Sequence, residues 1–148
     1  MRWLLTIISN TGMGLGEAAG LRLTNIKLDA PIPHIDLQPH PWRSLKTRGS
    51  RRLIPLVGSS LWAVERLMDS SGDDIMAFPS YCNERGCNAN SASNGLNKWP
   101  HQYAPDSCMI HSFRHSLRDR LRAVKCPSDI VDAIGDWTTA GIGQSYGN

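Results

Sequence analysis

The sequence has no apolar run long enough to cross a membrane, which takes about 20 residues. Residues 1–8 are apolar with one positive charge, but they have neither a long hydrophobic centre nor a small-residue cleavage site, which argues against a signal peptide. Internal repeats, low-complexity tracts and a convincing linker are also missing. The 148 residues therefore predict one globular domain with a sizeable core and no membrane partner.

Cysteine is sparse, and its four residues match no standard metal motif. Cys82 and Cys87 are separated by four residues, and no second pair at zinc spacing accompanies them. We therefore expect reduced, unpaired thiols in a cytosolic protein, with no bound metal and no cofactor. A zinc knuckle that recruits His101 is the alternative that the spacing leaves open.

Charge is only mildly unbalanced, at +3 with a sequence pI near 8.8, so net charge alone does not indicate a nucleic-acid partner. The distribution is more informative, because cations gather in two short segments while most acidic residues lie elsewhere. These segments contain Arg43, Lys46, Arg48, Arg51 and Arg52, and then Arg114, Arg118, Arg120, Arg122 and Lys125.

Apolar periodicity predicts a mostly helical α+β domain with a small antiparallel sheet. We expect a β-hairpin over residues 34–57, with a cationic tip and with Pro55 marking an edge strand. Ser59 or Ser60 should cap the helix that follows the hairpin, and Thr11 should cap the second helix. The expected helices cover residues 2–9, 11–21, 59–69, 91–99, 111–124 and 127–135, with a last short helix leading to Tyr146.

The last forty residues bring together groups suited to attack on a phosphodiester. His111, Arg114 and His115 open an amphipathic helix, Trp137 follows the next helix, and Tyr146 stands near the end of the chain. Arginine binds phosphate through a planar fork. A tyrosine hydroxyl has a pKa of about 10, so it needs a base or a strong positive field before it can attack.

Five segments in this order resemble the catalytic domain of the tyrosine recombinases, most closely the phage and prophage integrases. The segments are Thr11-Gly12 through Glu17 to Leu21, Leu45-Lys46-Thr47 with Ser50 to Leu56, His111-Ser-Phe-Arg114-His115, Gly135-Asp-Trp137, and Tyr146-Gly147. Each segment alone is a weak signal, but their order is specific. The resemblance covers the whole chain and implies the tyrosine-recombinase catalytic-domain fold over residues 1–148.

The resemblance also implies a reaction on double-stranded DNA without metal or ATP. Tyr146 would attack the scissile phosphorus to give a 3′-phosphotyrosine, and Lys46 would protonate the leaving 5′-oxygen. Arg114 would clamp the phosphate, His111 would assist proton transfer, and Trp137 would donate one hydrogen bond. Trp137 could equally be a core residue.

Six further residues are candidates for contacts with DNA phosphates, namely Arg43, Arg48, Arg51, Arg52, His115 and Arg118. The alternative for the hairpin cations is a merely solvated turn. We expect Glu17 to be a buried partner for a cation, and we place Asp132 and Asp136 at the surface without a role.

One departure from the family pattern bears on activity. The family's first catalytic arginine should stand at Gly14, and the matching neighbours indicate a substitution rather than a shifted alignment. Arg22 lies about two helical turns further along, so we do not expect it to compensate. We therefore predict that DNA cleavage by this chain is strongly impaired.

The resemblance leads us to expect a fragment that lacks the family's N-terminal DNA-binding domains and its C-terminal tail. Such a fragment would be a monomer, whereas the full-length protein would form a homotetramer on its attachment sites in the bacterial cytoplasm, at the nucleoid. Two alternatives remain to site-specific phage or prophage integration and excision. One is a type IB topoisomerase-like strand transferase, and the other is a degenerate prophage remnant that only binds DNA.

Overall fold

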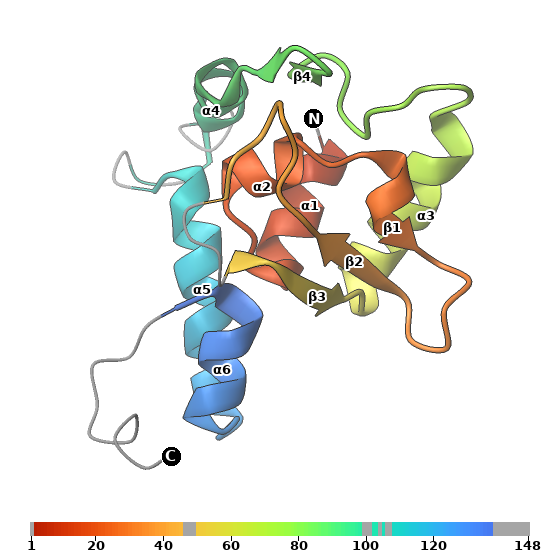
Figure 1. Cartoon of the computed structure of the whole chain (residues 1–148). Coiled ribbons are helices and arrows are strands. Elements are labelled where there is room, and N and C mark those ends of the chain that lie inside the picture. Colours follow the sequence, from red (N-terminus) through yellow and green to blue (C-terminus); the bar gives the residue numbers. More distant parts are fainter. Residues whose placement is uncertain (1, 46–49, 99–101, 104, 106–107, 138–148) are drawn as a thin grey trace.

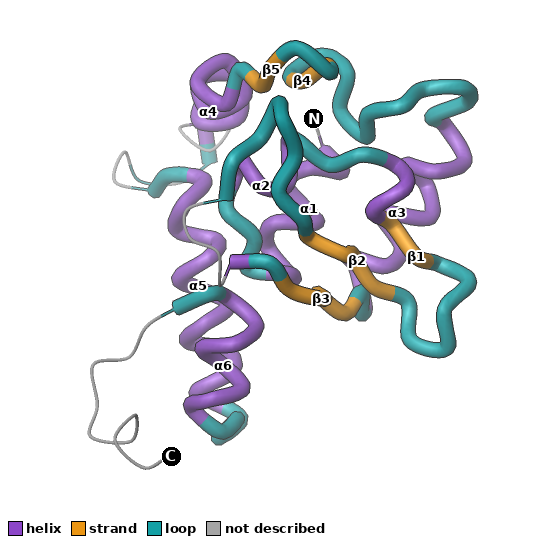
Figure 2. Tube along the Cα trace, in the orientation of Figure 1, coloured by secondary structure: helices purple, strands orange, loops and turns teal. Residues whose placement is uncertain are grey.

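The computed structural model describes residues 2–45, 50–98, 102–103, 105 and 108–137, and within them it confirms a mostly helical α+β fold with small antiparallel sheets (Figures 1 and 2). The helices are α1 (Arg2–Thr11), α2 (Leu15–Ala19), the 3-10 turn η1 (Leu23–Asn25), α3 (Gly58–Ser70), α4 (Ala89–Asn97), α5 (Ile110–Ala123) and α6 (Ser128–Gly135). The strands are β1 (Ile26–Lys27), β2 (His34–Leu37), β3 (Arg52–Pro55), β4 (Cys82–Asn83) and β5 (Gly86–Cys87).

Helix α1 forms the centre of the core. Leu4, Ile7 and Ile8 recur at helical spacing and are at most 1% exposed. The helix packs against α3 on one side and α5 on the other, while α6 lies beside α5 (Figure 1). Burial of α1 ties the N-terminal segment to α5, which carries the His-x-x-Arg motif and against which α6 packs.

The expected hairpin is present, and a third strand extends it. Strands β1, β2 and β3 are antiparallel in that order, with Ile35 paired to both Ile26 and Ile54 on the buried face. Pro55 lies on β3 at the edge of the sheet, as predicted. Strand β1 was not predicted because its two residues are too few to show a period of two.

The N-caps of two helices differ from the sequence expectations. Thr11 ends α1 rather than capping α2, because its buried hydroxyl donates to the Ile7 carbonyl at 2.6 Å. Gly14 takes the N-cap position of α2 instead. Val57 is the N-cap of α3, and Ser60 accepts the Val57 N–H at 3.2 Å from within the first turn.

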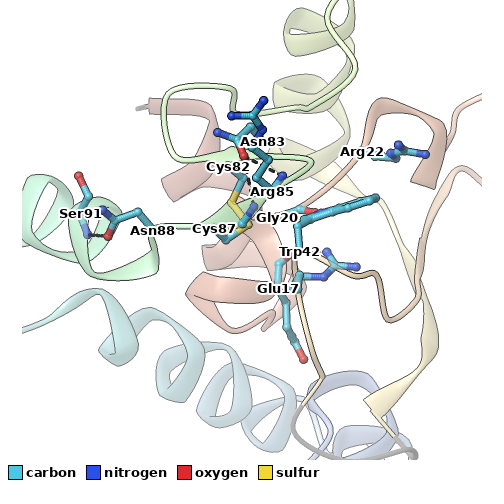
Figure 3. The surroundings of a disulfide bond; sticks show 12 residues. Glu17, Gly20, Arg22, Trp42, Cys82, Asn83, Arg85, Cys87, Asn88 and Ser91 are labelled. Atoms are coloured by element: carbon cyan, nitrogen blue, oxygen red, sulfur yellow. Dashed lines mark hydrogen bonds between the residues drawn. A yellow bond between two sulfur atoms is a disulfide. The ribbon is translucent and has the colours of Figure 1, made fainter.

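The expectation of unpaired thiols was wrong for two of the four cysteines. Cys82 and Cys87 form a disulfide across the β4–β5 hairpin, where their Cα atoms are 4.1 Å apart (Figure 3). Asn83 explains the turn, since its side-chain oxygen accepts the N–H groups of Arg85 and Gly86. This turn places the two sulfurs on facing strands, a consequence of pairing that the spacing alone did not reveal.

The remaining cysteines, Cys108 and Cys126, are free as expected. Within the described ranges, no three His, Cys, Asp or Glu side chains gather closely enough to hold a metal ion. His101, the ligand of the alternative zinc knuckle, lies outside those ranges. No helix in the described part of the chain combines the length and apolar character that crossing a membrane requires.

Candidate active site

Arg114 joins three segments of the site. It projects from the second turn of α5, where Nη1 donates to the Gly12 carbonyl at 2.7 Å and Nη2 donates to the Gly135 carbonyl. Its side chain is 14% exposed, so the guanidinium is largely sequestered while it still lines a cavity. The helix places it there because buried Ile110 and Leu117, four residues before it and three after it, lie on the same face of α5.

His111 lies one turn before Arg114 on the same helix and lines the same cavity. Its ring meets that of His115 edge-on, with centroids 4.7 Å apart. Desolvation, followed by the nearby His115 and Arg114, lowers the pKa of His111 below its usual 6.5. The neutral imidazole is therefore favoured at neutral pH, and in that form it can accept a proton.

The cavity has a volume of about 480 Å³ and brings together three of the predicted catalytic positions, Gly14, His111 and Arg114, with Arg43 from the predicted phosphate-contact residues. A second cavity of about 170 Å³ is lined by the same three residues, together with side chains from α1, α4 and the start of α5. Gly14 thus lines both cavities, beside His111 and Arg114 of the His-x-x-Arg motif.

The backbone at Gly14 does not require a glycine. Its φ of −67° and ψ of 151° are open to any L residue. A Cβ built there would meet only the Glu17 side chain, at 3.7 Å, which is ordinary van der Waals contact. The fold therefore has room for a side chain pointing toward Glu17, and the glycine is not explained by geometry.

Glu17 is a partner for cations, as predicted, although its side chain is 16% exposed and thus only partly buried. Its Oε2 lies 3.0 Å from Arg52 Nη2 and 3.9 Å from Arg114 Nη1, and it accepts the Gly14 N–H at 2.8 Å. Arg52 also donates from Nε to the Ile134 carbonyl at 3.1 Å, and its side chain is 9% exposed. Through Arg52, strand β3 is therefore linked both to the Glu17 carboxylate of α2 and to the main chain of α6.

Arg43 is buried instead of standing among the exposed cations that were expected near the hairpin tip. It is 5% exposed, its Nη1 donates to the Glu17 carbonyl at 2.7 Å, and its Nη2 donates to the Gln38 carbonyl. Burial lowers the pKa of Arg43 to about 10, which still leaves it charged at neutral pH. In this conformation the guanidinium holds a loop to α2 and does not face solvent.

Trp137 lies near the guanidinium groups of two arginines. Arg114 and Arg118 place their guanidinium carbons 5.3 and 5.5 Å from its ring centroid. Arg118 also pairs with Asp132 at 3.6 Å, so this cation has partners within the protein. Asp132, which was expected to be a surface residue without a role, instead anchors α6 to α5.

Asp136 also has a structural part that the sequence did not suggest. It adopts a left-handed conformation with φ of 51° at the end of α6, where its carboxylate accepts the hydroxyl of buried Ser50. It lines the larger cavity as well. Asp is one of the few residues that tolerate this conformation, and the buried Ser50 on the hairpin supplies a reason for it.

Trp42 is a cavity residue that sequence reasoning missed. Its ring stacks on His40 at 4.4 Å with the planes 10° apart, and the Arg22 guanidinium lies 4.6 Å from its centroid. Arg22 in turn pairs with Glu84 at 2.5 Å, which connects the Trp42 side of the cavity to the disulfide hairpin. Figure 3 shows Trp42 and Arg22 beside the hairpin that carries the disulfide. The proline-rich run around Trp42 shows no periodicity, so no pattern could have placed the ring.

Two predicted phosphate-contact residues are exposed, Arg51 before β3 and His115 on α5. Lys46, Arg48 and Tyr146 lie outside the described residues. The site assembled here therefore comprises the first motif, the His-x-x-Arg motif and Trp137.

Comparison with solved structures identifies the fold. The chain is similar to the Tn1549 transposon integrase (residues 82–397) in complex with circular intermediate DNA, at 16% identity and a TM-score of 0.67, over 92% of this chain and 49% of that one. It is similar to the XerA recombinase, at 12% identity and a TM-score of 0.67, over 93% and 47%. It is similar to the XerH site-specific recombinase bound to difH substrate, at 17% identity and a TM-score of 0.65, over 93% and 40%.

The chain thus spans half or less of the length of these three structures, and likeness at such low identity establishes the shared fold. Comparison with curated proteins returned no match. The model of the phage integrase family matches residues 1–148, so that the fold, the order of motifs and the family model agree. The chain belongs to the phage integrase family.

Proposed function

We propose that this chain is the catalytic region of a site-specific DNA recombinase that acts in phage or prophage integration or excision. The observation that carries the proposal is the meeting of Arg114, His111 and the Gly14 position in one cavity. A guanidinium held by two main-chain carbonyls is pre-oriented for a phosphate oxygen and needs little reorganisation during reaction. The partner is double-stranded DNA, of the kind bound to the Tn1549 integrase and XerH in their structures.

In this proposal Tyr146 attacks the scissile phosphorus, forming the bond to the 3′-phosphate as the 5′-oxygen leaves. Lys46 gives a proton to that 5′-oxygen, while Arg114 stabilises the charge on the non-bridging oxygens. His111, whose pKa is lowered, assists proton transfer as a neutral imidazole. Exposed Arg51 and His115, together with Arg48, contact flanking phosphates, whereas buried Arg43 and Arg52 support the site from within.

The glycine at position 14 should lower the rate of DNA cleavage. Removal of one preorganised charge donor lowers a rate by roughly a hundred- to a thousandfold. We infer that the chain binds DNA but cleaves it slowly. We further infer that the longer protein carries additional DNA-binding segments, works as a homotetramer on DNA and acts in the bacterial cytoplasm at the nucleoid. The chain alone should be a monomer with weak, salt-sensitive binding.

Covalent trapping tests the proposal directly. The chain and its Gly14→Arg variant are incubated at low salt with nicked duplexes of randomised sequence, which prevent religation after cleavage. We expect a covalent adduct that maps to Tyr146 by peptide mass spectrometry and is lost in Gly14→Arg/Tyr146→Phe. An adduct on another residue would contradict the assignment of the nucleophile.

A second candidate, a degenerate DNA-binding remnant, is favoured by one observation, the glycine that the backbone does not require. If Gly14→Arg binds DNA but forms no adduct at all, this second candidate replaces the first. Relaxation of supercoiled plasmid without strand exchange would instead indicate the topoisomerase-like alternative.

A further inference from the structure

Arg52 occupies an unusual place for a residue of a cation-rich hairpin. Its guanidinium is turned inward, with Nη2 at 3.0 Å from Glu17 Oε2 and Nη1 at 3.3 Å from Glu17 Oε1. Nη1 also donates to the Ser50 carbonyl at 2.9 Å, and Nε to the Ile134 carbonyl at 3.1 Å. With 9% of its side chain exposed, it cannot reach DNA in this conformation.

The distances show which cation neutralises Glu17. Arg52 meets both carboxylate oxygens with a fork, the strongest geometry for such a pair. Arg114 stands further off, at 3.9 Å, and its two hydrogen bonds go to the neutral carbonyls of Gly12 and Gly135. The Glu17 charge is therefore matched mainly by Arg52, and the charge of Arg114 beside the cavity is only partly compensated, by the longer contact with Glu17 and by Asp136.

We propose that Arg52 is a positioning residue that neutralises Glu17 and so keeps the Arg114 guanidinium available to a phosphate. This inference rests on the proposed function, because it assumes that Arg114 binds the scissile phosphate. It replaces the expected direct phosphate contact by Arg52 with an indirect role through a shared carboxylate. It also explains why a strand residue of the hairpin reaches across to the end of α6.

These charges predict how oxyanion binding should change when the charge of Arg52, that of Glu17, or both are removed. Without Arg52, the part-buried Glu17 carboxylate has Arg114 as its nearest cation among the described residues, and the two would pair at the expense of any bound oxyanion. Without the Glu17 charge, Arg52 adds an uncompensated positive charge near the cavity and strengthens oxyanion binding. Removal of both charges together restores the original balance. A purely structural Arg52 would give no such restoration, because both variants would lose bonds.

The test is titration of the full chain with inorganic sulfate, followed by amide chemical shifts in NMR. Sulfate keeps its charge throughout the useful pH range and mimics a tetrahedral phosphate. We expect Arg52→Gln to weaken sulfate binding about tenfold and Glu17→Gln to strengthen it several-fold, from the Coulomb energy of one charge at this separation in a partly buried site. Glu17→Gln/Arg52→Gln should lie within about twofold of the unaltered chain.

Arg66→Gln is the matched control, since Arg66 pairs with Asp69 at 3.5 Å on the exposed face of α3 and should leave sulfate binding unchanged. If the double variant binds sulfate as weakly as Arg52→Gln, the inference is overturned. If Arg52→Gln does not fold, Glu17→Gln and the double variant still test the inference. Sulfate binding by Glu17→Gln that is equal to or weaker than that of the unaltered chain contradicts the inference.

Arg114→Gln separates this inference from the proposed function. Loss of sulfate binding in Arg114→Gln with no change in Arg52→Gln overturns the inference alone. No change in Arg114→Gln removes the proposed phosphate site, and the inference with it.

Discussion

An arginine at position 14 should accelerate the proposed DNA cleavage, and the structure indicates that the fold will accept it. The backbone there is extended, with φ of −67° and ψ of 151°, and the first side-chain carbon would lie 3.7 Å from Glu17. The capping bond from the residue-14 N–H to Glu17 is made by the main chain, so it survives the change.

The cost to folding should be small because two effects oppose each other. Replacement of glycine at an unstrained position stabilises by about 0.4–1 kcal/mol through the unfolded chain. A cation at the start of helix α2 is unfavourable by about 0.3–1 kcal/mol. We therefore expect the free energy of unfolding of Gly14→Arg to stay within about 1 kcal/mol of the unaltered chain, as measured by urea denaturation.

The gain in catalysis should be much larger. A charge donor aimed at the developing negative charge contributes roughly 3–4 kcal/mol, or a hundred- to a thousandfold in rate. The new guanidinium would enter the cavity that Arg114 and His111 already line, which has a volume of about 480 Å³. Glu17 on its near side provides a carboxylate to orient it.

Single-turnover cleavage of the nicked duplexes selected by trapping measures this effect. Gly14→Gln is the matched control, because glutamine has a comparable reach and hydrogen-bond donors but no charge. We expect Gly14→Arg to cleave at least a hundredfold faster than Gly14→Gln. Equal rates for the two variants would refute both the alignment of the first motif and the electrostatic argument built on it.

Two further predictions concern pH and redox state. Because the folded state lowers the pKa of His111, the folded protein binds fewer protons than the unfolded chain just below pH 6.5; stability from this group is therefore complete above that pH and is lost as pH falls through the lowered folded pKa. His111→Gln should flatten this part of the profile of unfolding free energy against pH, and an unchanged slope would contradict the assignment. Reduction of the Cys82–Cys87 bond, which closes a very short loop, should lower stability by about 2 kcal/mol and the Tm by several degrees. Cys87→Ser should abolish the sensitivity of Tm to reductant, whereas Cys108→Ser, at a free thiol, should retain it.

Patterns within single elements were predictable from the sequence. Leu4, Ile7 and Ile8 recur at helical spacing and do form the buried face of α1. His111 and Arg114, three residues apart, lie near each other on one helix whatever the rest of the fold does. The expected hairpin with Pro55 at its edge is equally local, because strand alternation and proline chemistry depend only on neighbouring residues.

Pairings between distant segments were not predictable in the same way. The basic run from Arg43 to Arg52 looked like one exposed patch, yet both of its end residues turn inward, Arg43 to the main-chain carbonyl of Glu17 and Arg52 to its carboxylate. Charge along a sequence does not say which side chains turn inward, since that depends on a carboxylate from another helix. The Cys82–Cys87 disulfide likewise depends on the turn that brings two short strands together.

The sequence by itself predicted the class of chemistry, because the order of its motifs resembles a family with a phosphate-binding arginine, a histidine and a tyrosine. It also indicated Gly14 as the position where the family pattern has a cation. Only the tertiary structure decided that the glycine is not required by the backbone, that it opens onto the cavity of Arg114, and that Arg52 neutralises Glu17 there. The physical reason is that charge balance in a buried site is a property of distances between side chains, and those distances exist only after α2, β3, α5 and α6 have packed together.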